Sequence, residues 1–508
     1  MQSKDKRIVK NTLIVYLQLF VSMAVNLVAS RFVLQALGAS DYGLFNVVGG
    51  VIAMFTFVSG SLLITTVRFL NYEMGKPDGN VNMIFNQSFI LHLLFSIFIF
   101  ILLESAGLFY ILNYLNVDVG KEADAMFVFQ LSTIVACLSV VGVPFQSLFV
   151  AHERFSIIAV VDVVCSVVKL LMVCFLLCYD GNALRLYSVI MAFVILTPFV
   201  SYYLMGKKLW PSVVKWNYVK KWVLYKEQIS YFNWNLLDAA AMVLRAQGAT
   251  LLINWFFGTI INAAYAIANT VLQQVNNFVG KFDVAVAPQI TQNLGAGNDD
   301  RSVMLASLTC RICVLVMELI FFSLIVELEF ILRLWLGDAL PEGTVRFCQF
   351  TLLVALVSST SSGLLQLING LGKIKWFKIQ KGIWYLLALF FGYLLFCYDY
   401  PPDIVVLLFV VSDVLCRMTQ FFLLKRIYNF DVRDFIREAY TRPAAVFMLM
   451  SVFVVFYRSL NVTGLIASIF GIVLTLFVAL ITVVLVGLNH IERTKLFNMI
   501  LQRLAFKK

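Results

Sequence analysis

The chain has 508 residues, of which 61% are hydrophobic and only 13% are charged. A soluble protein of this size could not bury so much apolar surface, so the composition excludes a soluble enzyme and indicates a polytopic membrane protein. The net charge is +11, but in a membrane protein the placement of Lys and Arg in the loops carries more information than their sum.

The start of the chain predicts an N-terminus that is not cleaved. Lys4, Lys6, Arg7 and Lys10 precede an apolar run that is too long for a signal-peptide core and lacks a small-residue cleavage site. Because a spanning helix needs about twenty apolar residues, we predict fourteen transmembrane helices. Their ranges are roughly 11–37, 43–66, 85–109, 126–150, 155–178, 185–205, 229–256, 259–287, 302–331, 346–371, 379–398, 403–424, 443–458 and 463–487.

The charges in the loops predict that both termini are cytoplasmic. Most basic residues fall in segments that this topology places inside, and the outer loops are too short for a folded domain. The longest inner connection, 206–228, mixes lysines with tryptophans, which is typical of an amphipathic helix at the membrane interface. The basic residues of the outer loops are Lys121, Arg185, Arg333, Arg346 and Arg458.

The two halves of the sequence resemble each other faintly. Leu37-Gly38 begins the turn after helix 1, and Phe257-Gly258 begins the turn after helix 7, about 220 residues later. This offset spans six helices, so the repeats have the same orientation, as in parallel-repeat transporters. We predict an all-α membrane fold of two six-helix lobes with two added C-terminal helices. Its parts are an N-lobe (1–205), a cytoplasmic linker helix (206–228), a C-lobe (229–427), the last two helices with their preceding loop (428–487) and a basic amphipathic cytoplasmic tail (488–508).

Several predicted helices carry an acid and a base on one face. A spacing of seven residues is nearly two turns, and a spacing of four is one turn. Such pairs either neutralise each other and hold helices together, or face a water-filled cavity; we favour the cavity for Asp238 and Arg245. The pairs are Asp162 with Lys169, Asp238 with Arg245, Arg311 with Glu318, and Asp413 with Arg417.

The predicted span 259–287 carries a polar stripe. Asn262, Asn269, Asn276 and Asp283 recur every seven residues, and Gln273 lies one turn from Asn269. Amides can bond neighbouring helices, but a stripe along a whole span favours a face toward water or a polar substrate.

Arg31 lies in the outer half of helix 1, where it either snorkels to the surface or binds an anion. Together with Lys169 and Arg245 it could hold a diphosphate. Cys310 and Cys313 form a C-x-x-C pair, but no second pair or histidine cluster completes a metal site. The sequence contains no Walker A loop or nucleophile elbow, so we expect no ATP hydrolysis by this chain.

These residues resemble the Wzx-type polysaccharide flippases of the multidrug/oligosaccharidyl-lipid/polysaccharide exporter superfamily. The first matching piece is Arg31-x-x-Leu34-x-x-Leu37-Gly38-x-x-Asp41-Tyr42-Gly43, followed by Arg68-Phe69 and Glu73-Met74-Gly75-Lys76. The stretch 266–295, with Pro288, is similar to the second-half counterpart. The resemblance implies a MATE-like arrangement of two lobes around a central cavity. It also implies gating or structural roles for Gly38, Asp41, Gly43, Arg68 and Pro288.

The resemblance implies a flippase of the bacterial inner membrane rather than an enzyme. Such proteins move undecaprenyl-diphosphate-linked oligosaccharides, the repeat units of O-antigen or capsule, to the outer leaflet by alternating access. We expect coupling to H⁺ or Na⁺ through Asp162 or Asp238, and no metal, other cofactor or nucleic acid. Expected partners are the lipid-linked oligosaccharide, membrane lipids, and glycosyltransferases and polymerase of the same pathway. Under this hypothesis Arg31→Ala and Arg245→Ala each impair flipping. The proposed substrate-binding residues are Arg31, Lys169, Arg245, Asn262, Asn269, Gln273 and Asn276.

Two alternatives stay open at this point. The first is a cation-coupled multidrug exporter of the same superfamily, which fourteen helices and a strongly polar second half argue against. The second is a membrane glycan polymerase or ligase. That enzyme would need catalytic residues in a sizeable outer loop, and no predicted outer loop is long enough.

Overall fold

The computed structural model describes residues 56–113, 120–220, 222–336, 341–428, 430–460, 464–489 and 492–494, with scattered positions between 14 and 48. Arg31 and Gly43 of the predicted site lie outside the described residues, as does most of the predicted tail (488–508). The described part of the chain is almost wholly helical and contains no strand.

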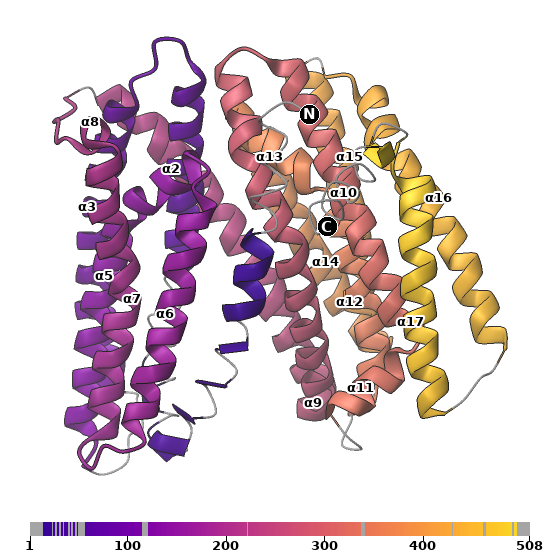
Figure 1. Ribbon diagram of the computed structural model, residues 1–508. Helices are drawn as coiled ribbons and strands as arrows, with labels where there is room; N and C mark the ends of the chain where they lie inside the picture. Colours follow the sequence, from indigo (N-terminus) through magenta and orange to yellow (C-terminus); the bar gives the residue numbers. More distant parts are fainter. Residues whose placement is uncertain are drawn as a thin grey trace, which may run out of the picture. The chain divides into compact units, whose positions relative to one another are not determined.

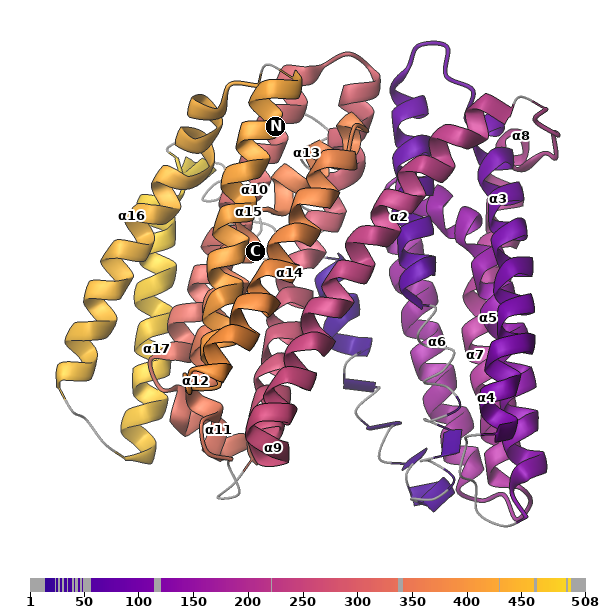
Figure 2. The same ribbon diagram turned by 180° about the vertical axis from the view of Figure 1, so that it is seen from behind.

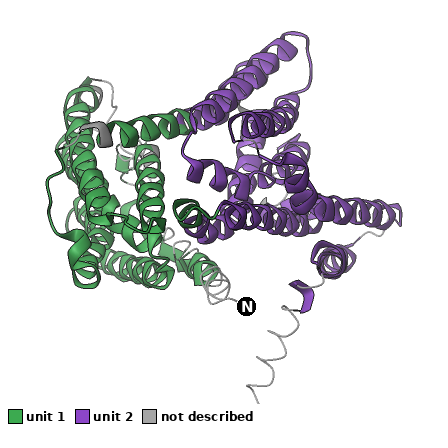
Figure 3. Ribbon diagram, turned by 90° about the horizontal axis from the view of Figure 1, so that it is seen from above, with its two compact units in different colours: residues 1–239, 291–298 green, residues 240–290, 299–508 purple. Residues whose placement is uncertain are grey.

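The chain divides into two compact units, which Figure 3 colours separately. Unit 1 comprises residues 1–239 and 291–298, and unit 2 comprises 240–290 and 299–508. The units change within α9 (Trp222–Gly295), after residues 239 and 290, and again directly before α10 (Asp299–Ile325). The helices of unit 1 before α9 are α2 (Thr56–Gly75), α3 (Val81–Leu102), the π turn η1 (Leu103–Gly107), α4 (Leu108–Asn113), α5 (Glu122–Ala151), α6 (Phe155–Leu176), α7 (Ala183–Leu209) and α8 (Pro211–Val214).

The long helix α9 (Trp222–Gly295) contains two predicted spans that meet at a kink. The kink is at Gly258, which has φ 78° and ψ −172°, a conformation that favours glycine because it has no Cβ. Gly38, its predicted repeat partner, also has a positive φ, of 71°. Both predicted turns therefore contain a glycine with a positive φ.

Unit 2 continues with helices that Figures 1 and 2 show from opposite sides. The last two helices pack against α10 and against each other, as expected for helices added to a lobe. The helices are α10 (Asp299–Ile325), α11 (Leu328–Leu336), α12 (Thr344–Ser359), α13 (Ser362–Leu371), α14 (Lys375–Cys397), α15 (Ile404–Tyr428), α16 (Val432–Ser459), α17 (Leu465–Thr482) and the π turn η2 (Val483–Gly487).

Ten helices in the described part are long and apolar enough to cross a membrane, or eleven if α12 and α13, bent by 44°, form one span. The predicted all-α polytopic fold is thereby confirmed. The second half of α9 is not among the ten. Its predicted amide stripe lowers its hydropathy below that of an ordinary span.

Helix α17 illustrates how residue size separates lipid-facing and protein-facing surfaces. Its large apolar side chains lie exposed on one face, while small residues are buried on the other. Small side chains let helix backbones approach closely inside a membrane. The exposed residues include Ile466, Phe470, Val473 and Phe477, and the buried ones are Ser468, Gly471, Thr475 and Ala479.

The segment predicted to form one linker helix, 206–228, is divided in the structure. Helix α7 continues to Leu209, α8 forms a single turn, residues 215–220 are not helical, and α9 begins at Trp222. The break falls at Pro211, which lacks the N–H needed to continue α7 but suits the first turn of α8.

Candidate functional site

The candidate site is a cavity of about 300 Å³ inside unit 2. It lies between the α9 residues on both sides of the Gly258 kink and helices α12, α14 and α15. Four of the predicted substrate-binding residues line it: Arg245, Asn269, Gln273 and Asn276. The other polar and aromatic residues of its wall are Gln247, Thr250, Tyr265, Thr351, Ser358, Tyr385 and Phe409.

Arg245 is held by a carboxylate from another helix. Its Nη1 donates to Oδ1 and Oδ2 of Asp413 at 3.0 and 3.2 Å, and its Nη2 donates to Oδ2 at 3.2 Å. The Ser358 hydroxyl donates to the same Oδ2 at 3.1 Å. The guanidinium carbon lies 4.4 Å from the ring centroids of both Tyr385 and Phe409. The charge of Arg245 is thus neutralised and stacked on aromatic rings.

These charges bind across helices rather than along a single helix. The spacing related Arg245 to Asp238 and Asp413 to Arg417 and left open whether such residues pair or face a cavity. In the structure Arg245 on α9 and Asp413 on α15 bind each other, and Arg245 also lines the cavity. Arg417 instead donates to Thr360 Oγ1 at 3.2 Å and to Gln420 Oε1 at 2.5 Å. The bond between α9 and α15 satisfies both charges at once, whereas the within-helix spacing required each long side chain to lie along its own helix.

In the described part of the chain, Arg311 and Glu318, which share a face of α10 by their spacing, have different surroundings. Arg311 forms an ion pair with Glu492 and donates to the backbone carbonyl of Glu438 at 3.2 Å. Glu318 is only 3% exposed, and its Oε2 has no hydrogen-bond partner in the described part of the chain. Arg311 therefore joins α10 to the start of α16 and to the short helical piece 492–494.

The polar stripe of residues 262–283, on the second half of α9, has two different environments along its length. Asn269, Gln273 and Asn276 line the cavity. Asp283, further along, accepts a hydrogen bond at 2.8 Å from Gln366 Nε2 on α13, so it ties two helices together. Asn262 is half-buried on α9 and is not among the residues that line the cavity.

The remaining predicted coupling and substrate residues belong to unit 1. Asp162 on α6 accepts a hydrogen bond from Gln18 Nε2 at 2.8 Å. Lys169, two turns further along α6, is half-buried, and Asp238 is half-buried on α9. These positions stay predictions as functional residues.

The residues of the resemblance motif have structural contacts in unit 1. Asp41 forms an ion pair with Lys121, which caps the start of α5. The Arg68 guanidinium lies 4.6 Å from the ring centroid of Phe69, 5.0 Å from that of Tyr72 and 5.3 Å from that of Tyr231. Asp41 therefore pairs with Lys121, and Arg68 lies among three rings.

The last motif residue, Pro288, lies inside the second half of α9, before its C-terminal end. It is buried in that helix.

Sequence reasoning missed part of the cavity wall. Tyr265 could have been found, because it lies one turn before Asn269 on the same helix. Tyr385, Phe409 and Ser358 come from three other helices and carry no sequence signal that links them to α9.

The wall offers hydroxyl and amide groups beside aromatic rings. Among the described residues that line it there is no Asp or Glu, and the one guanidinium is already paired. Amides and hydroxyls both donate and accept, so they bond uncharged polar groups such as hydroxyls. Rings supply flat apolar surface beside them. This chemistry suits a polar ligand without a positive charge.

Neither a protein-family model nor a curated protein matches the sequence. Solved structures do match. One is an outward-facing multidrug resistance MATE family transporter of the MOP superfamily, with a TM-score of 0.67 and 13% identity over 83% of this chain and 95% of that chain. The fold is that of a MATE transporter.

Two further transporter structures are similar to this chain over most of its length. A MOP superfamily transporter from Pyrococcus furiosus has a TM-score of 0.65 and 15% identity, covering 83% of this chain and 95% of that chain. A mutant of the Vibrio cholerae MATE transporter VcmN has a TM-score of 0.62 and 16% identity, covering 84% of this chain and 97% of that chain. At these identities the match establishes the two-lobed transporter fold and a multi-pass membrane protein, and leaves the substrate to the chemistry of the site.

Proposed function

We propose that the protein flips undecaprenyl-diphosphate-linked oligosaccharides from the inner to the outer leaflet of the bacterial inner membrane. The transporter fold supports alternating access as the mechanism. The substrate is a repeat unit of a surface polysaccharide, and a gradient of H⁺ or Na⁺ drives its movement. Asp162 and Asp238 are the proposed coupling carboxylates, and Lys169, with Arg31, is a proposed contact for the diphosphate.

The polarity of the unit 2 cavity is the observation that supports this substrate over an organic cation. A transporter of organic cations needs a counter-charge for a cation that leaves water, because an unpaired charge is costly to desolvate. The described lining has no carboxylate, and its single cation is neutralised by Asp413. Asn269, Gln273 and Asn276 instead present amides that match sugar hydroxyls.

The size of the cavity limits what it holds. Its volume of about 300 Å³ lies at the lower end of small-molecule pockets, which span roughly 300–1,000 Å³. It therefore accommodates part of an oligosaccharide, and the prenyl chain stays in the bilayer. Where the sugar is acidic, its oxyanion competes with Asp413 for the planar donors of Arg245.

The test is a leaflet-access assay in liposomes with the purified protein and a lipid-linked oligosaccharide. We expect Gln273→Leu to slow flipping, because each lost hydrogen bond of about 1 kcal/mol lowers affinity roughly fivefold. Gln274→Leu is the matched control, since Gln274 is the next residue, is exposed and does not line the cavity. Equal rates for both variants, or no flipping by the wild type, would refute the proposal.

The second candidate is a cation-coupled multidrug exporter, and it has a specific observation in its favour. One matching structure is a multidrug resistance transporter. However, the Pyrococcus furiosus structure is described as having a binding pocket of reversed polarity that suggests a different function, so pocket polarity varies on this fold. Drug susceptibility of a deletion strain separates the two candidates: unchanged susceptibility with loss of surface polysaccharide supports the flippase. In vitro polymerisation of lipid-linked repeats by the pure protein would instead establish a polymerase.

A further inference from the structure

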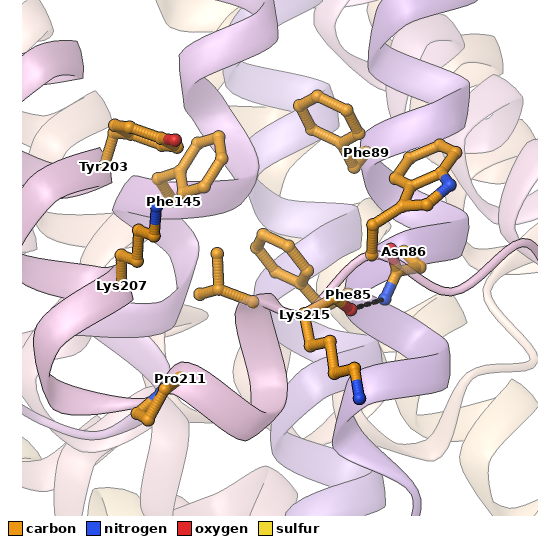
Figure 4. Close-up of a pocket in the computed structure, with 10 residues that line it drawn as sticks. Phe85, Asn86, Phe89, Phe145, Tyr203, Lys207, Pro211 and Lys215 are labelled. Carbon is orange, nitrogen blue, oxygen red and sulfur yellow. Dashed lines mark hydrogen bonds between the residues drawn. The ribbon is translucent and has the colours of Figure 1, made fainter.

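Unit 1 contains a second cavity, of about 420 Å³, that the proposed function does not use. It lies between α3, α5, α7 and the short helix α8 with the segment that follows it (Figure 4). Its lining is mostly aromatic and apolar, with two lysines. The lining residues are Phe85, Asn86, Phe89, Phe145, Tyr203, Lys207, Pro211, Val214, Lys215 and Trp216.

The rings form a connected apolar wall. The centroid of Phe145 lies 5.3 Å from that of Phe85, 5.8 Å from that of Phe89 and 5.3 Å from that of Tyr203. Trp216 meets Phe89 edge-on at 6.0 Å. A space of this size with aromatic walls favours hydrocarbon over water, because water in a cavity needs several polar partners.

Two asparagines of α3 hold the opposite wall in place. Nδ2 of Asn82 donates to the carbonyls of Ser212, Val213 and Lys215 at 3.0, 2.8 and 2.7 Å. The carbonyls at the end of a helix have no partner within the helix, so this one side chain caps α8. The wall is therefore built before any ligand arrives.

Asn86 fixes the segment after α8 in the same way. It is 1% exposed, donates to the Lys215 carbonyl at 3.0 Å, and accepts from the backbone N–H of Asn217 at 3.1 Å. Figure 4 shows the first of these bonds. These bonds place Lys215 and Trp216 at the cavity, and a ligand gains affinity from a wall that needs no ordering.

The charge at the cavity is positive. Lys207 and Lys215 are exposed, and no carboxylate is among the described lining residues. Figure 4 shows the Lys207 side chain directed toward Tyr203 and Phe145, and the Lys215 side chain directed away from the rings. Both lysines belong to the connection that the charge distribution predicts to be cytoplasmic, where the membrane surface carries anionic lipids.

We propose that this cavity binds an anionic glycerophospholipid of the inner leaflet. An acyl chain occupies the space between the rings of Phe85, Phe89 and Phe145, and the positive charge of Lys207 and Lys215 attracts the anionic headgroup to the edge of the cavity. The apolar wall and the cationic edge match the two ends of one such lipid. A free phosphate would leave the aromatic wall without a partner. The proposal does not depend on the transported substrate.

The test measures bound lipid by native mass spectrometry of the purified full-length protein. The detergent is supplemented with phosphatidylglycerol or with phosphatidylcholine of the same acyl chains. We expect the wild type to retain phosphatidylglycerol over phosphatidylcholine by roughly tenfold, because the two lysines place positive charge at the cavity. K207Q with K215Q should remove that preference. K208Q is the matched control, since Lys208 follows Lys207 on α7, is exposed and does not line the cavity.

Two further arms keep the proposal falsifiable. Val214→Trp places an indole ring in the cavity, so it should reduce the binding of both lipids. The mass spectra report lipid bound to protein that remains folded. Inorganic phosphate should not compete with phosphatidylglycerol at matched ionic strength. Equal preference in K207Q/K215Q and K208Q, or complete displacement by inorganic phosphate, would overturn the assignment.

Discussion

Arg245 and Asp413 form an ion pair that is shielded from solvent on both sides. Their side chains are 13% and 6% exposed. Two charges taken out of water are costly, and three hydrogen bonds together with the Ser358 hydroxyl offset that cost here. Such a pair contributes little net stability compared with an apolar pair, but removal of one partner leaves a buried charge uncompensated.

We therefore predict strong non-additivity at this pair. Asp413→Leu should lower the free energy of unfolding by about 3–5 kcal/mol, because Arg245 is left without a counter-charge. The double variant Arg245→Met with Asp413→Leu should recover most of that loss. Denaturant unfolding of the purified protein in detergent measures both values.

The exposed pair of Arg333 and Glu329 provides the control for this prediction. Its side chains are 57% and 61% exposed, so Glu329→Gln should change stability by less than about 1 kcal/mol. Purely additive losses at Arg245 and Asp413 would show that the two charges are not coupled.

At the residue scale, periodicity along one helix could be predicted and partners across helices could not. The spacing of Asn269, Gln273 and Asn276 identified one face of α9, and the structure brings these residues to one cavity. The partner of Arg245 lies 168 residues away on α15. No pattern within α9 or α15 says that these two helices are neighbours, so spacing could relate each charge only to residues of its own helix.

At the scale of helices, the ends of α2 and α9 pack at two glycines of unit 1. A Cβ on Gly75 would overlap the carbonyl oxygen of Gln292, and a Cβ on Gly295 would overlap that of Tyr72. The Gln292 side chain secures the contact, since its Nε2 donates to Asn71 Oδ1 at 3.1 Å and to the Ala151 carbonyl at 2.9 Å. Gly75 and Gly295 occupy equivalent positions in the predicted repeat.

We predict that Gly75→Ala separates these helix ends and lowers the free energy of unfolding by about 1–3 kcal/mol, because backbone atoms must move to admit the methyl group. Gly60→Ala in the same helix is the control. A Cβ at Gly60 meets nothing within 4 Å, so this change should be neutral or should stabilise α2 by up to about 1 kcal/mol. The measurement compares the denaturant midpoints of unfolding of the two variants. Equal shifts in the midpoint would argue against a tight contact at Gly75.

The bend in the predicted span 346–371 has a local cause that sequence reasoning overlooked. Between α12 and α13, Ser359, Thr360 and Ser361 donate their hydroxyls to backbone carbonyls of the preceding turn at 2.7, 2.6 and 2.6 Å. Side chains that bond nearby carbonyls compete with the regular helical pattern and bend helices. Hydropathy alone detected the span, but the run of hydroxyl residues from 358 to 362 indicated where it breaks.

At the scale of the whole molecule, the hydrophobic pattern predicted the fold although no family model matches the sequence. A transporter fold tolerates 13–16% identity because lipid-facing positions require only apolar side chains, as the exposed face of α17 illustrates. Loops, by contrast, determine the orientation in the membrane through their basic residues. The predicted orientation is therefore open to a direct chemical test.

Two native cysteines offer that test. Of the nine cysteines only Cys178, just after α6, and Cys397, at the end of α14, are exposed. The predicted topology places both on the outer side of the membrane. We expect a membrane-impermeant maleimide to label both in intact spheroplasts, and C178S and C397S each to remove one site of labelling. N217C, in the predicted cytoplasmic segment, should react only after the membrane is permeabilised, because the reagent cannot reach the inner side. Rapid labelling of N217C in intact spheroplasts would show that the orientation is the opposite of the predicted one.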